Sequence, residues 1–324
     1  MAARENWSFP ESLQPRPEEV AFDLAAALDA VVQLRSHVPE EAFTAGILGT
    51  ERVGNGVVIG EDGLVLTIGY LITEAQTIWI ATNRGAVLQG HALAYDQATG
   101  FGLVLALGDL AVRPLARGSS ASCGVGEEVY MLGAGGRAHA LKARVFARRE
   151  FAGYWEYVLD EAILTAPAHP QWGGAALVAR DGRLAGIGSL LVQELDRGRL
   201  TQGNMSVPVE LLEPILDDLV RYGRANRPPR AWLGMYVQES EGKLVVGGLV
   251  TGGPADRAGV KLGDAVLEVA GERATGLADL FRRIWALGPA GTEIPLTLAR
   301  GATRLEVRAL SADRNDFLLK PRMH

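Results

Sequence analysis

Few residues of this chain carry side chains that could do chemistry, and their spacing is loose. The sequence has one cysteine, Cys123, and five histidines, none of which adjoins it. A thiol without a histidine partner is more often a small buried group than a nucleophile. We therefore predict a structural Cys123. A single cysteine also permits no internal disulfide, so folding does not depend on an oxidising compartment.

The histidines and glycines also form no recognisable binding motif. His91, His139 and His169 lie in separate segments, and no group of histidine, cysteine and carboxylate residues has the spacing of a metal site. The glycine-rich stretch at 133–136 is not followed by Lys-Ser or Lys-Thr, so it predicts a turn rather than a phosphate loop. We expect no metal and no other cofactor.

The composition limits the class of protein. The 324 residues suffice for two or three domains, and 48% hydrophobic with 22% charged residues is ordinary globular usage. The net charge of -6 and the lack of a basic stripe argue against a nucleic-acid partner. The first ten residues lack a basic region followed by an apolar stretch, and no run of about 18 apolar residues occurs. These observations predict a soluble, cytoplasmic protein without a membrane partner.

Glycines and short apolar runs predict a mainly β protein. Forty glycines accompany many short runs of valine, leucine and isoleucine, as tight turns between short strands require. Between residues 45 and 207 this pattern favours a barrel or a sandwich. The expected strands are 56–59, 64–67, 77–81, 103–107, 128–132, 177–179 and 184–191.

Two helices are expected beside this β-rich segment. Apolar residues recur every three to four positions over residues 17–38, which predicts an amphipathic helix. Its apolar face packs either on its own domain or on another subunit. The same period predicts a helix over 208–222, and the prolines in 224–230 predict a linker.

The last part of the chain predicts an independent domain of mixed structure. Its expected strands are 232–237, 243–250, 265–269, 294–298 and 304–310, and its expected helices are 254–258 and 277–287.

The segment 54–67 carries a longer motif, Gly-Asn-Gly-Val-Val-Ile-Gly-Glu-Asp-Gly-Leu-Val-Leu-Thr. It resembles the first hairpin of the HtrA/Deg family of trypsin-like serine proteases. Segments at 119–133, 204–208, 221–224 and 232–235 match that family in the same order, and this collinearity is more specific than any one short motif. The resemblance implies a mainly β fold, a trypsin-like double six-stranded β-barrel followed by an α+β PDZ domain.

On this resemblance we expect five segments. Residues 1–40 form an N-terminal arm and amphipathic helix, and residues 41–223 form the protease-fold domain. A linker at 224–230 leads to a PDZ domain at 231–312, and residues 313–324 form a tail.

The resemblance also locates three catalytic positions, and none holds the residue of the family. Tyr70 stands where the family has histidine in Leu-Thr-x-x-His, and Gly100 stands at the aspartate. Asp96 matches a surface turn residue. Gly173 takes the place of the serine, or Trp172 does after a shift of one residue. A phenol of pKa about 10 cannot act as the base, and neither glycine nor tryptophan is a nucleophile, so we predict that the serine-protease chemistry is lost.

Two further residues bear on that site. Gln171 replaces the glycine that helps to shape the oxyanion hole. Trp172 has a ring that fills the old cleft if it points inward and belongs to the core otherwise.

The PDZ-like part is expected to bind an extended peptide as an added strand, with backbone amides receiving the terminal carboxylate. Residues 232–235 match the carboxylate-binding loop of the family, and 236–237 begin the strand that pairs with the ligand. The helix from Leu277 supplies the wall of the pocket or part of the core. The predicted peptide-binding residues are Trp232, Leu233, Gly234, Met235, Tyr236, Val237, Leu280 and Ile284, with Phe281 beside them.

The leading interpretation is a proteolytically inactive HtrA-like protein that acts as a peptide-binding scaffold, adaptor or chaperone-like partner. Its partners are then protein or peptide C-termini. Members of the family commonly form trimers, which implies a homo-oligomer or a complex with an active relative. Two alternatives stay open: a serine-type endopeptidase with a rebuilt site that uses His169, and a structural subunit of a larger complex.

Overall fold

The computed structural model describes residues 7–196 and 199–319, and the chain folds as two compact units. Unit 1 comprises Met1–Arg149, Glu161–Asn226 and Leu319–His324. Unit 2 comprises Glu150–Asp160 and Arg227–Leu318. Each unit is therefore assembled from separate stretches of the chain.

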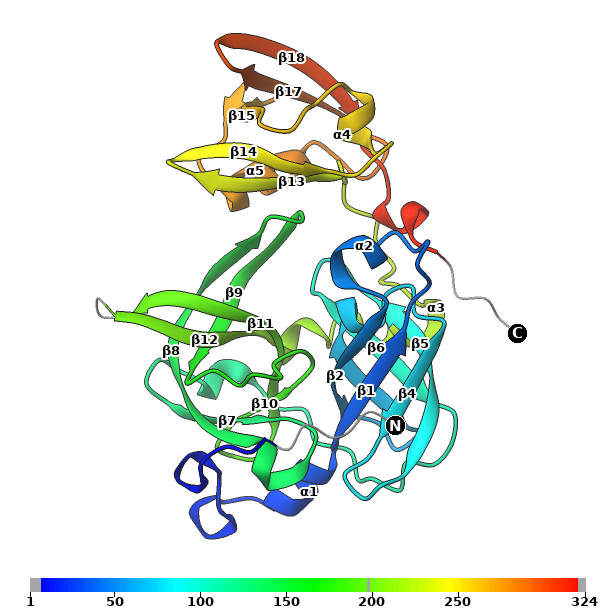
Figure 1. Ribbon diagram of the computed structural model, residues 1–324, viewed down its shortest axis with the longest axis vertical. Coiled ribbons are helices and arrows are strands. Elements are labelled where there is room, and N and C mark those ends of the chain that lie inside the picture. Colours follow the sequence, from blue (N-terminus) through cyan, green and yellow to red (C-terminus); the bar gives the residue numbers. More distant parts are fainter. Residues whose placement is uncertain (1–6, 197–198, 320–324) are drawn as a thin grey trace. The chain divides into compact units, whose positions relative to one another are not determined.

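The first six strands form a closed barrel in the order β1-β2-β3-β6-β5-β4 (Figure 1). Side chains alternate along β1, where Val32 and Leu34 are buried while Gln33 and Arg35 are exposed. This period of two is typical of a strand with one buried face. The bounds are β1 Val31–His37, β2 Glu51–Val58, β3 Leu64–Ile68, β4 Thr77–Ala81, β5 Val87–Tyr95 and β6 Phe101–Ala106.

The next six strands form a second closed barrel, in the order β10-β11-β12-β9-β8-β7. Its core contains Met131, Leu141 and Leu177. Cys123 is buried in the same core, as predicted, and its burial raises the pKa of the thiol. The bounds are β7 Glu128–Leu132, β8 Ala140–Gly153, β9 Tyr157–Ala166, β10 Ala176–Val178, β11 Leu184–Asp196 and β12 Arg199–Pro208.

Unit 2 contains one antiparallel sheet in the order β13-β14-β15-β17-β18, with β16 paired to β15. The helix α5, Leu277–Ala286, packs Leu280, Phe281 and Ile284 into the core of this unit. A short helix, α4, covers Pro254–Arg257. The strands are β13 Met235–Ser240, β14 Lys243–Leu249, β15 Ala265–Val269, β16 Glu272–Arg273, β17 Glu293–Arg300 and β18 Thr303–Leu310.

The predicted helix over residues 17–38 is wrong in its extent. The helix α1 covers only Leu24–Asp29, and the residues after it form β1. Val31 and Val32 are β-branched and favour a strand, and this preference outweighs the helical period read across them. The buried face of α1 packs within the chain itself, so the structure gives no support to a helix reserved for another subunit.

The helix predicted over 208–222 is shorter than expected. The helix α3 covers Leu216–Tyr222 and follows a single helical turn at Val209–Leu211. Pro214 lies between them, and proline cannot supply the N–H that a helix interior needs. A further short helix, α2, covers Ala45–Leu48.

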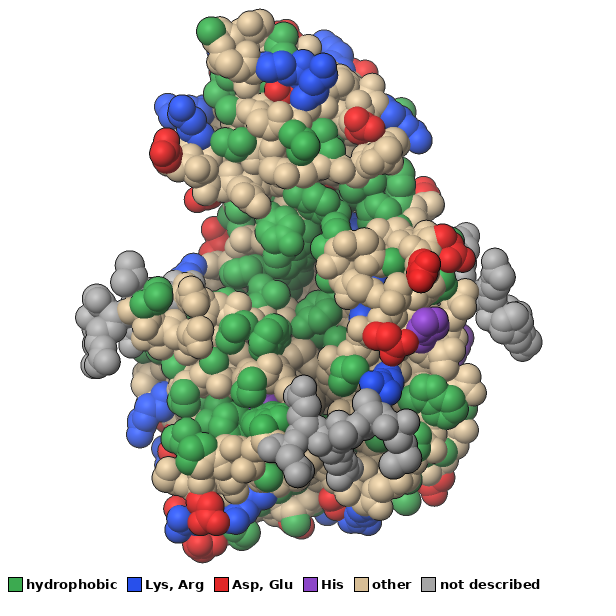
Figure 2. Space-filling model, viewed as in Figure 1, with side chains coloured by type: hydrophobic (Ala, Val, Ile, Leu, Met, Phe, Trp, Pro, Cys, Tyr) green, Lys and Arg blue, Asp and Glu red, His purple; other side chains and the backbone are tan. Residues whose placement is uncertain are grey.

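Two surface properties concern partners. None of the helices in residues 7–196 and 199–319 is long and apolar enough to cross a bilayer. On the face drawn in Figure 2, lysine and arginine side chains are dispersed among aspartate and glutamate side chains.

Candidate functional site

Tyr70 and Gly173 face each other in unit 1. Tyr70 lies in the helical turn Gly69–Leu71 that follows β3, and Gly173 lies in the loop before β10. A β-carbon on Gly173 would lie 2.7 Å from the Tyr70 hydroxyl oxygen, which is inside van der Waals contact. That hydroxyl donates a hydrogen bond of 2.9 Å to the Ser189 carbonyl. Burial raises the pKa of Tyr70 well above its usual value, so the phenol stays protonated at neutral pH.

His169 is fully buried, and both of its ring nitrogens are engaged. Its Nδ1 accepts a hydrogen bond from the Gln171 N–H at 3.1 Å, which places the proton on Nε2. The Nε2–H then donates to the His139 carbonyl at 2.9 Å. Burial lowers the pKa of His169 to about 4. The ring is therefore neutral and structural at neutral pH, and it offers no free nitrogen to a substrate.

Asn55 on β2 fixes the loop that contains Gly173. Its Nδ2 donates to the carbonyls of Gln171 at 2.8 Å and Gly173 at 3.1 Å, and its Oδ1 accepts from the Ala134 N–H at 2.9 Å. An oxyanion hole needs N–H groups directed at the substrate oxygen. The Gln171 N–H is instead directed at His169.

Gly100 lies in the turn between β5 and β6, close to the turn of Tyr70. Its carbonyl accepts a hydrogen bond from the Gly69 N–H at 2.7 Å. Asp96 accepts from the N–H and the hydroxyl of Thr99 at 2.9 and 2.8 Å, which is a turn role as predicted. The predicted surface location of Asp96 is wrong, because only 8% of the residue is exposed. Its short side chain is buried because these two hydrogen bonds hold it against Thr99 of the same turn.

In unit 2, three consecutive backbone amides converge on one carboxylate, that of Glu156. The N–H groups of Leu233, Gly234 and Met235 donate to its oxygens at 3.0, 2.7 and 3.3 Å. Gly234 has a φ of +70°, a conformation that favours glycine. Successive N–H groups of this kind form a concave anion site. The sequence predicted the loop, but it gave no signal for Glu156.

The environment of Glu156 opposes its charge. The residue is 4% exposed, and burial raises the pKa of Glu156 to about 7 although the loop N–H groups act to lower it. Arg314 also acts to lower this pKa. The carboxyl group therefore titrates near neutral pH while it remains in the loop.

Residues on either side of Glu156 make further contacts within unit 2. The Val237 N–H, on β13, donates to the Tyr154 carbonyl at 3.1 Å. Val158 belongs to the same core cluster as Leu233 and Met235. The turn from β8 to β9 thus contacts the predicted carboxylate-binding loop, the predicted ligand-pairing strand and the core.

Comparison with known proteins assigns these two parts of the chain to families. A trypsin-like peptidase domain matches residues 54–187, and a PDZ domain matches residues 231–310. The "Probable periplasmic serine endoprotease DegP-like" of Pseudomonas fulva (strain 12-X) is 25% identical, and the aligned region covers 86% of this chain and 61% of that protein. The chain is an HtrA/DegP-family trypsin-like peptidase domain with a C-terminal PDZ domain.

Other relatives agree with this assignment. "Protease Do-like 1, chloroplastic" of Arabidopsis thaliana is 26% identical over 82% of this chain and 64% of its own length. "Serine endoprotease DegS" of Salmonella typhimurium (strain 14028s / SGSC 2262) is 24% identical over 91% of this chain and 86% of its own length. The chain therefore spans less than two thirds of the Pseudomonas and Arabidopsis proteins.

Solved HtrA-type structures share the fold. The structure entitled "HtrA-type protease AlgWS227A with tripeptide" superposes with a TM-score of 0.54 at 19% identity, and the match covers 93% of this chain and 99% of that chain. The serine endoprotease from Yersinia pestis gives a TM-score of 0.53 at 21% identity, with 91% of this chain and 99% of that chain covered. The expected architecture of a trypsin-like double barrel and a PDZ domain is confirmed.

The expectation of a cytoplasmic protein is wrong. The DegP-like relatives from Pseudomonas fulva and Halomonas elongata are both named as periplasmic endoproteases. The cytoplasmic expectation relied on the pattern of the first ten residues and on the lack of a long apolar run. Neither property distinguishes a water-soluble domain of one compartment from that of another.

The predicted peptide-binding residues come together in the PDZ domain, but most of them are buried. Tyr236 alone is partly exposed, and the loop residues are covered by the turn that carries Glu156. Arg230 lies with its guanidinium 4.1 Å from the centre of the Trp285 ring of α5. The buried ones among the predicted residues are Trp232, Leu233, Gly234, Met235, Val237, Leu280, Phe281 and Ile284.

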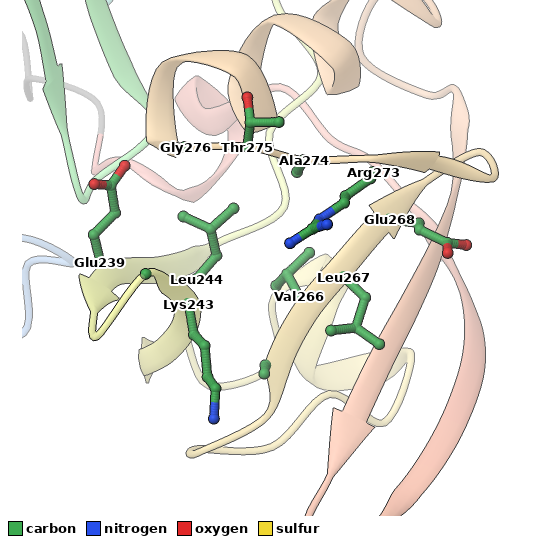
Figure 3. Close-up of a pocket in the computed structure, with 12 residues that line it drawn as sticks. Glu239, Lys243, Leu244, Val266, Leu267, Glu268, Arg273, Ala274, Thr275 and Gly276 are labelled. Atoms are coloured by element: carbon green, nitrogen blue, oxygen red, sulfur yellow. The ribbon is translucent and has the colours of Figure 1, made fainter.

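A pocket of about 280 Å³ in the PDZ domain lies away from this loop. Figure 3 shows Arg273 directed toward Val266 while Glu268 points away from it. Glu239 on its rim accepts a hydrogen bond from the Leu277 N–H at 2.7 Å and so caps α5. None of the predicted peptide-binding residues lines this pocket.

A larger cavity, of about 460 Å³, lies in the peptidase-like unit. Polar residues such as Gln33, Asn83 and Gln171 line it, together with Trp7. Trp172 is half-buried, so it is not a fully packed core tryptophan. It does not line this cavity. Within the described residues, no group of three or more His, Cys, Asp or Glu side chains is placed to hold a metal ion.

Proposed function

We propose that this HtrA/DegP-family chain binds peptides or protein C-termini through its PDZ domain and does not cleave them. It then acts as a scaffold, an adaptor or a chaperone-like partner. The observation that carries this proposal is the loop at 233–235, whose three N–H groups already hold a carboxylate. A peptide C-terminus presents the same two oxygens, and capture of a terminal carboxylate by backbone amides is a known mode of peptide recognition.

The barrel junction supports the absence of cleavage. Serine proteolysis needs a nucleophilic hydroxyl, a neutral base that accepts its proton, and an acid that orients the base. At the positions aligned with these groups we assign Gly173, Tyr70 and Gly100. The Tyr70 phenol is protonated and donates to a backbone carbonyl, so it cannot accept a proton there.

The alternative of a rebuilt endopeptidase would use His169 as its base. Both ring nitrogens of His169 are occupied by backbone partners, and burial lowers its pKa to about 4, so the ring is neutral at neutral pH. A general base needs a free acceptor atom within reach of the proton that it removes. The geometry of His169 therefore favours the non-cleaving function over this alternative.

Location and assembly are part of the same proposal. Because DegP-like relatives are named as periplasmic, we place this protein in the periplasm. We also propose that it self-associates, as a trimer by family resemblance, or pairs with an active relative. Light scattering on purified protein measures the mass of the assembly directly.

One experiment separates the candidate functions. Purified full chain is assayed for cleavage of casein and of a quenched fluorescent peptide, and then for binding to displayed peptides with free or amidated C-termini. We expect no turnover above buffer and binding that requires the free carboxylate. Turnover that is abolished in a folded His169→Gln variant but unchanged by Glu306→Ala, which alters an exposed residue of the other unit, would establish the rebuilt endopeptidase. No affinity for any C-terminus would favour the structural subunit.

A further inference from the structure

We propose that residues 154–158, at the tip of the β8–β9 hairpin, are an internal ligand of the PDZ domain. In this arrangement the Glu156 carboxylate occupies the place of the terminal carboxylate of a peptide. If the PDZ domain binds C-terminal peptides, as proposed above, those peptides must displace the hairpin tip. The site is then closed by the chain itself until a competitor arrives.

The carboxylate contacts are those of a bound ligand. Oε1 of Glu156 accepts from Gly234 at 2.7 Å and from Met235 at 3.3 Å, and Oε2 accepts from Leu233 at 3.0 Å. All three donors are consecutive main-chain N–H groups, so neither oxygen depends on a particular side chain of the loop. A side-chain carboxylate and an α-carboxylate present equivalent oxygens to such a loop.

The hairpin tip also copies the strand contact of a peptide ligand. The Val237 N–H donates to the Tyr154 carbonyl at 3.1 Å, and Val237 lies on β13, the strand predicted to pair with ligand. A peptide that adds to a sheet edge uses main-chain hydrogen bonds of this kind. The Tyr154 ring packs edge-on against Tyr236 of the same strand, with centroids 5.9 Å apart.

The tip also contributes an apolar side chain, as a bound peptide would. Val158 is 6% exposed and belongs to the core cluster that contains Leu280 and Ile284 of α5. These two residues were predicted as the wall of the peptide pocket. The tip therefore supplies a carboxylate, a main-chain acceptor and an apolar side chain, the three elements by which a PDZ ligand is recognised.

Charged residues hold the base of the tip on α5. Arg282 pairs with Glu150 through one nitrogen and with Asp160 through another, the second at 2.5 Å. Both acidic residues flank the tip in the sequence. All three side chains are solvent-exposed, so these pairs are screened by salt and can be broken without leaving a buried charge.

The conformation of the tip suits this task. Glu156 has a φ of +61°, which is uncommon outside glycine and turns its side chain back toward the loop. A β-carbon on Gly153 would lie 2.6 Å from the Trp155 ring, so glycine there lets that ring fold over the backbone. The Trp155 ring stacks on Tyr157 at 5.6 Å. The tip is thus a preformed turn.

The competitor that these contacts select is a peptide with a free α-carboxylate and an apolar residue near its end. Because the tip is tethered, it competes at an effective concentration of about millimolar, as short linkers give. The apparent affinity of a peptide falls in proportion to the fraction of molecules whose site is open. Removal of the Glu156 carboxylate should therefore raise peptide affinity without any new contact to the peptide.

The test uses the full chain with Glu156→Ala, the isosteric Glu156→Gln, and a control, Glu306→Ala, which alters an exposed glutamate on β18 of the same unit. The probe is a pool of fluorescein-labelled decapeptides that end in valine with a free carboxylate, and a matched amidated pool. Fluorescence anisotropy measures affinity. Hydrogen exchange follows the amides of residues 154–158 and 233–235, with and without saturating peptide.

We expect Glu156→Ala to bind the free-carboxylate pool at least about tenfold more tightly than the wild type or the control. Saturating peptide should accelerate exchange at 154–158 in the wild type while 233–235 stay protected. Equal affinities with no acceleration at 154–158 would overturn the internal ligand and leave peptide binding intact. A third outcome is that no variant binds peptide, while amide exchange at 233–235 becomes faster only in the Glu156 variants. This result would support the internal ligand and refute the peptide-binding function. If Glu156→Ala does not fold, Glu156→Gln decides both points.

Discussion

Single side chains determine what the barrel junction can do, and the pair of Tyr70 and Gly173 is the clearest case. A tyrosine hydroxyl fills the space that a β-carbon on Gly173 would need, and it is held there by the Ser189 carbonyl. A serine introduced at Gly173 therefore cannot be accommodated unless the Tyr70 hydroxyl moves. The two residues form a matched pair, large opposite small.

Gly173→Ser tests this pairing. The new β-carbon would displace Tyr70 and break its hydrogen bond, so we expect a loss of about 1–3 kcal/mol in the free energy of unfolding and no gain of proteolysis. Urea denaturation and casein cleavage measure the two effects. The double variant Tyr70→Ala/Gly173→Ser is the control, because it removes the obstructing ring. A single variant as stable as the wild type would show that the loop relaxes freely.

His169 predicts a pH dependence of stability. Its folded pKa of about 4 lies below the usual 6.5, so the unfolded chain binds the proton first as the pH falls. The stability that neutral His169 contributes is fully present above about pH 6.5 and is lost between there and about pH 4, by about 2 kcal/mol at pH 5. Urea denaturation of wild type and His169→Gln at pH 7 and pH 5 isolates this difference. An equal change in both proteins would refute it.

Glu156 predicts a pH dependence of peptide binding, and its pKa is shifted in the direction opposite to that of His169. Its docked pKa of about 7 lies above the usual 4.5, so docking of the tip is strongest below about pH 4.5 and weakens as the pH rises through 7. The ionisable groups that interact with it are Arg314 and Tyr236, and Tyr154 lies against Tyr236. Since a peptide α-carboxylate is already ionised, we expect peptide affinity to rise roughly tenfold between pH 5.5 and pH 8. Glu156→Gln should show a flat profile. A wild-type profile as flat as that of the variant would contradict the assignment.

At the scale of elements, strands with an undivided apolar run were predictable and those with long polar faces were not. The strands β4 and β7 have the bounds expected from the sequence, Thr77–Ala81 and Glu128–Leu132. β8 was missed because its buried residues alternate with lysine and arginine, as in Leu141-Lys142-Ala143-Arg144-Val145. That pattern has the period of two of a half-buried strand, and its charged members conceal it.

The loop at 232–235 shows the limit of motif reasoning. Its sequence predicted a carboxylate-binding conformation, and the three amides do converge. The carboxylate that they hold comes from a turn about 77 residues earlier in the chain, as the separation of Glu156 and Leu233 gives. No local pattern around Glu156 marks it, because its role depends on a tertiary contact. The loop at 232–235 was therefore predictable from the sequence, and the Glu156 carboxylate that it binds was not.

Asn55 predicts how the loops at the barrel junction are held. Asn55→Ala on β2 leaves the Ala134 N–H without its acceptor, and it removes the donor to two carbonyls of the 171–173 loop. We expect a loss of about 2–3 kcal/mol in the free energy of unfolding, because buried groups lose their partners. Urea denaturation measures it. Asn55→Asp would place a buried carboxylate oxygen against the same two carbonyls, so it should destabilise at least as much as alanine. An alanine variant of wild-type stability would refute the account.

At the scale of the whole molecule, the PDZ-containing unit is not a simple C-terminal appendage. Residues 150–160 cluster with Arg227–Leu318, although the strands on both sides of them belong to the second barrel. A family boundary at residue 231 therefore omits a piece of what packs together. The core of unit 2 includes Val158, and its anion site includes Glu156.

The isolated fragment Arg227–Leu318 tests this organisation. Without the tip, it loses the packing of Val158 and should unfold about 1–3 kcal/mol more easily than the same unit in the full chain, since a buried valine contributes about that much. Its anion site is open, so it should bind free-carboxylate peptides more tightly than the full chain does, with an affinity that no longer depends on pH between about 5.5 and 8.

A synthetic hairpin of residues 148–162, closed by a disulfide between added terminal cysteines, should compete with those peptides. The same hairpin with Glu156→Gln should compete at least about tenfold less well, because its NH2 group cannot accept a hydrogen bond from the loop N–H groups and so only one acceptor oxygen remains. Equal competition by both hairpins would mean that packing alone holds the tip in place, and the carboxylate would lose its assigned role.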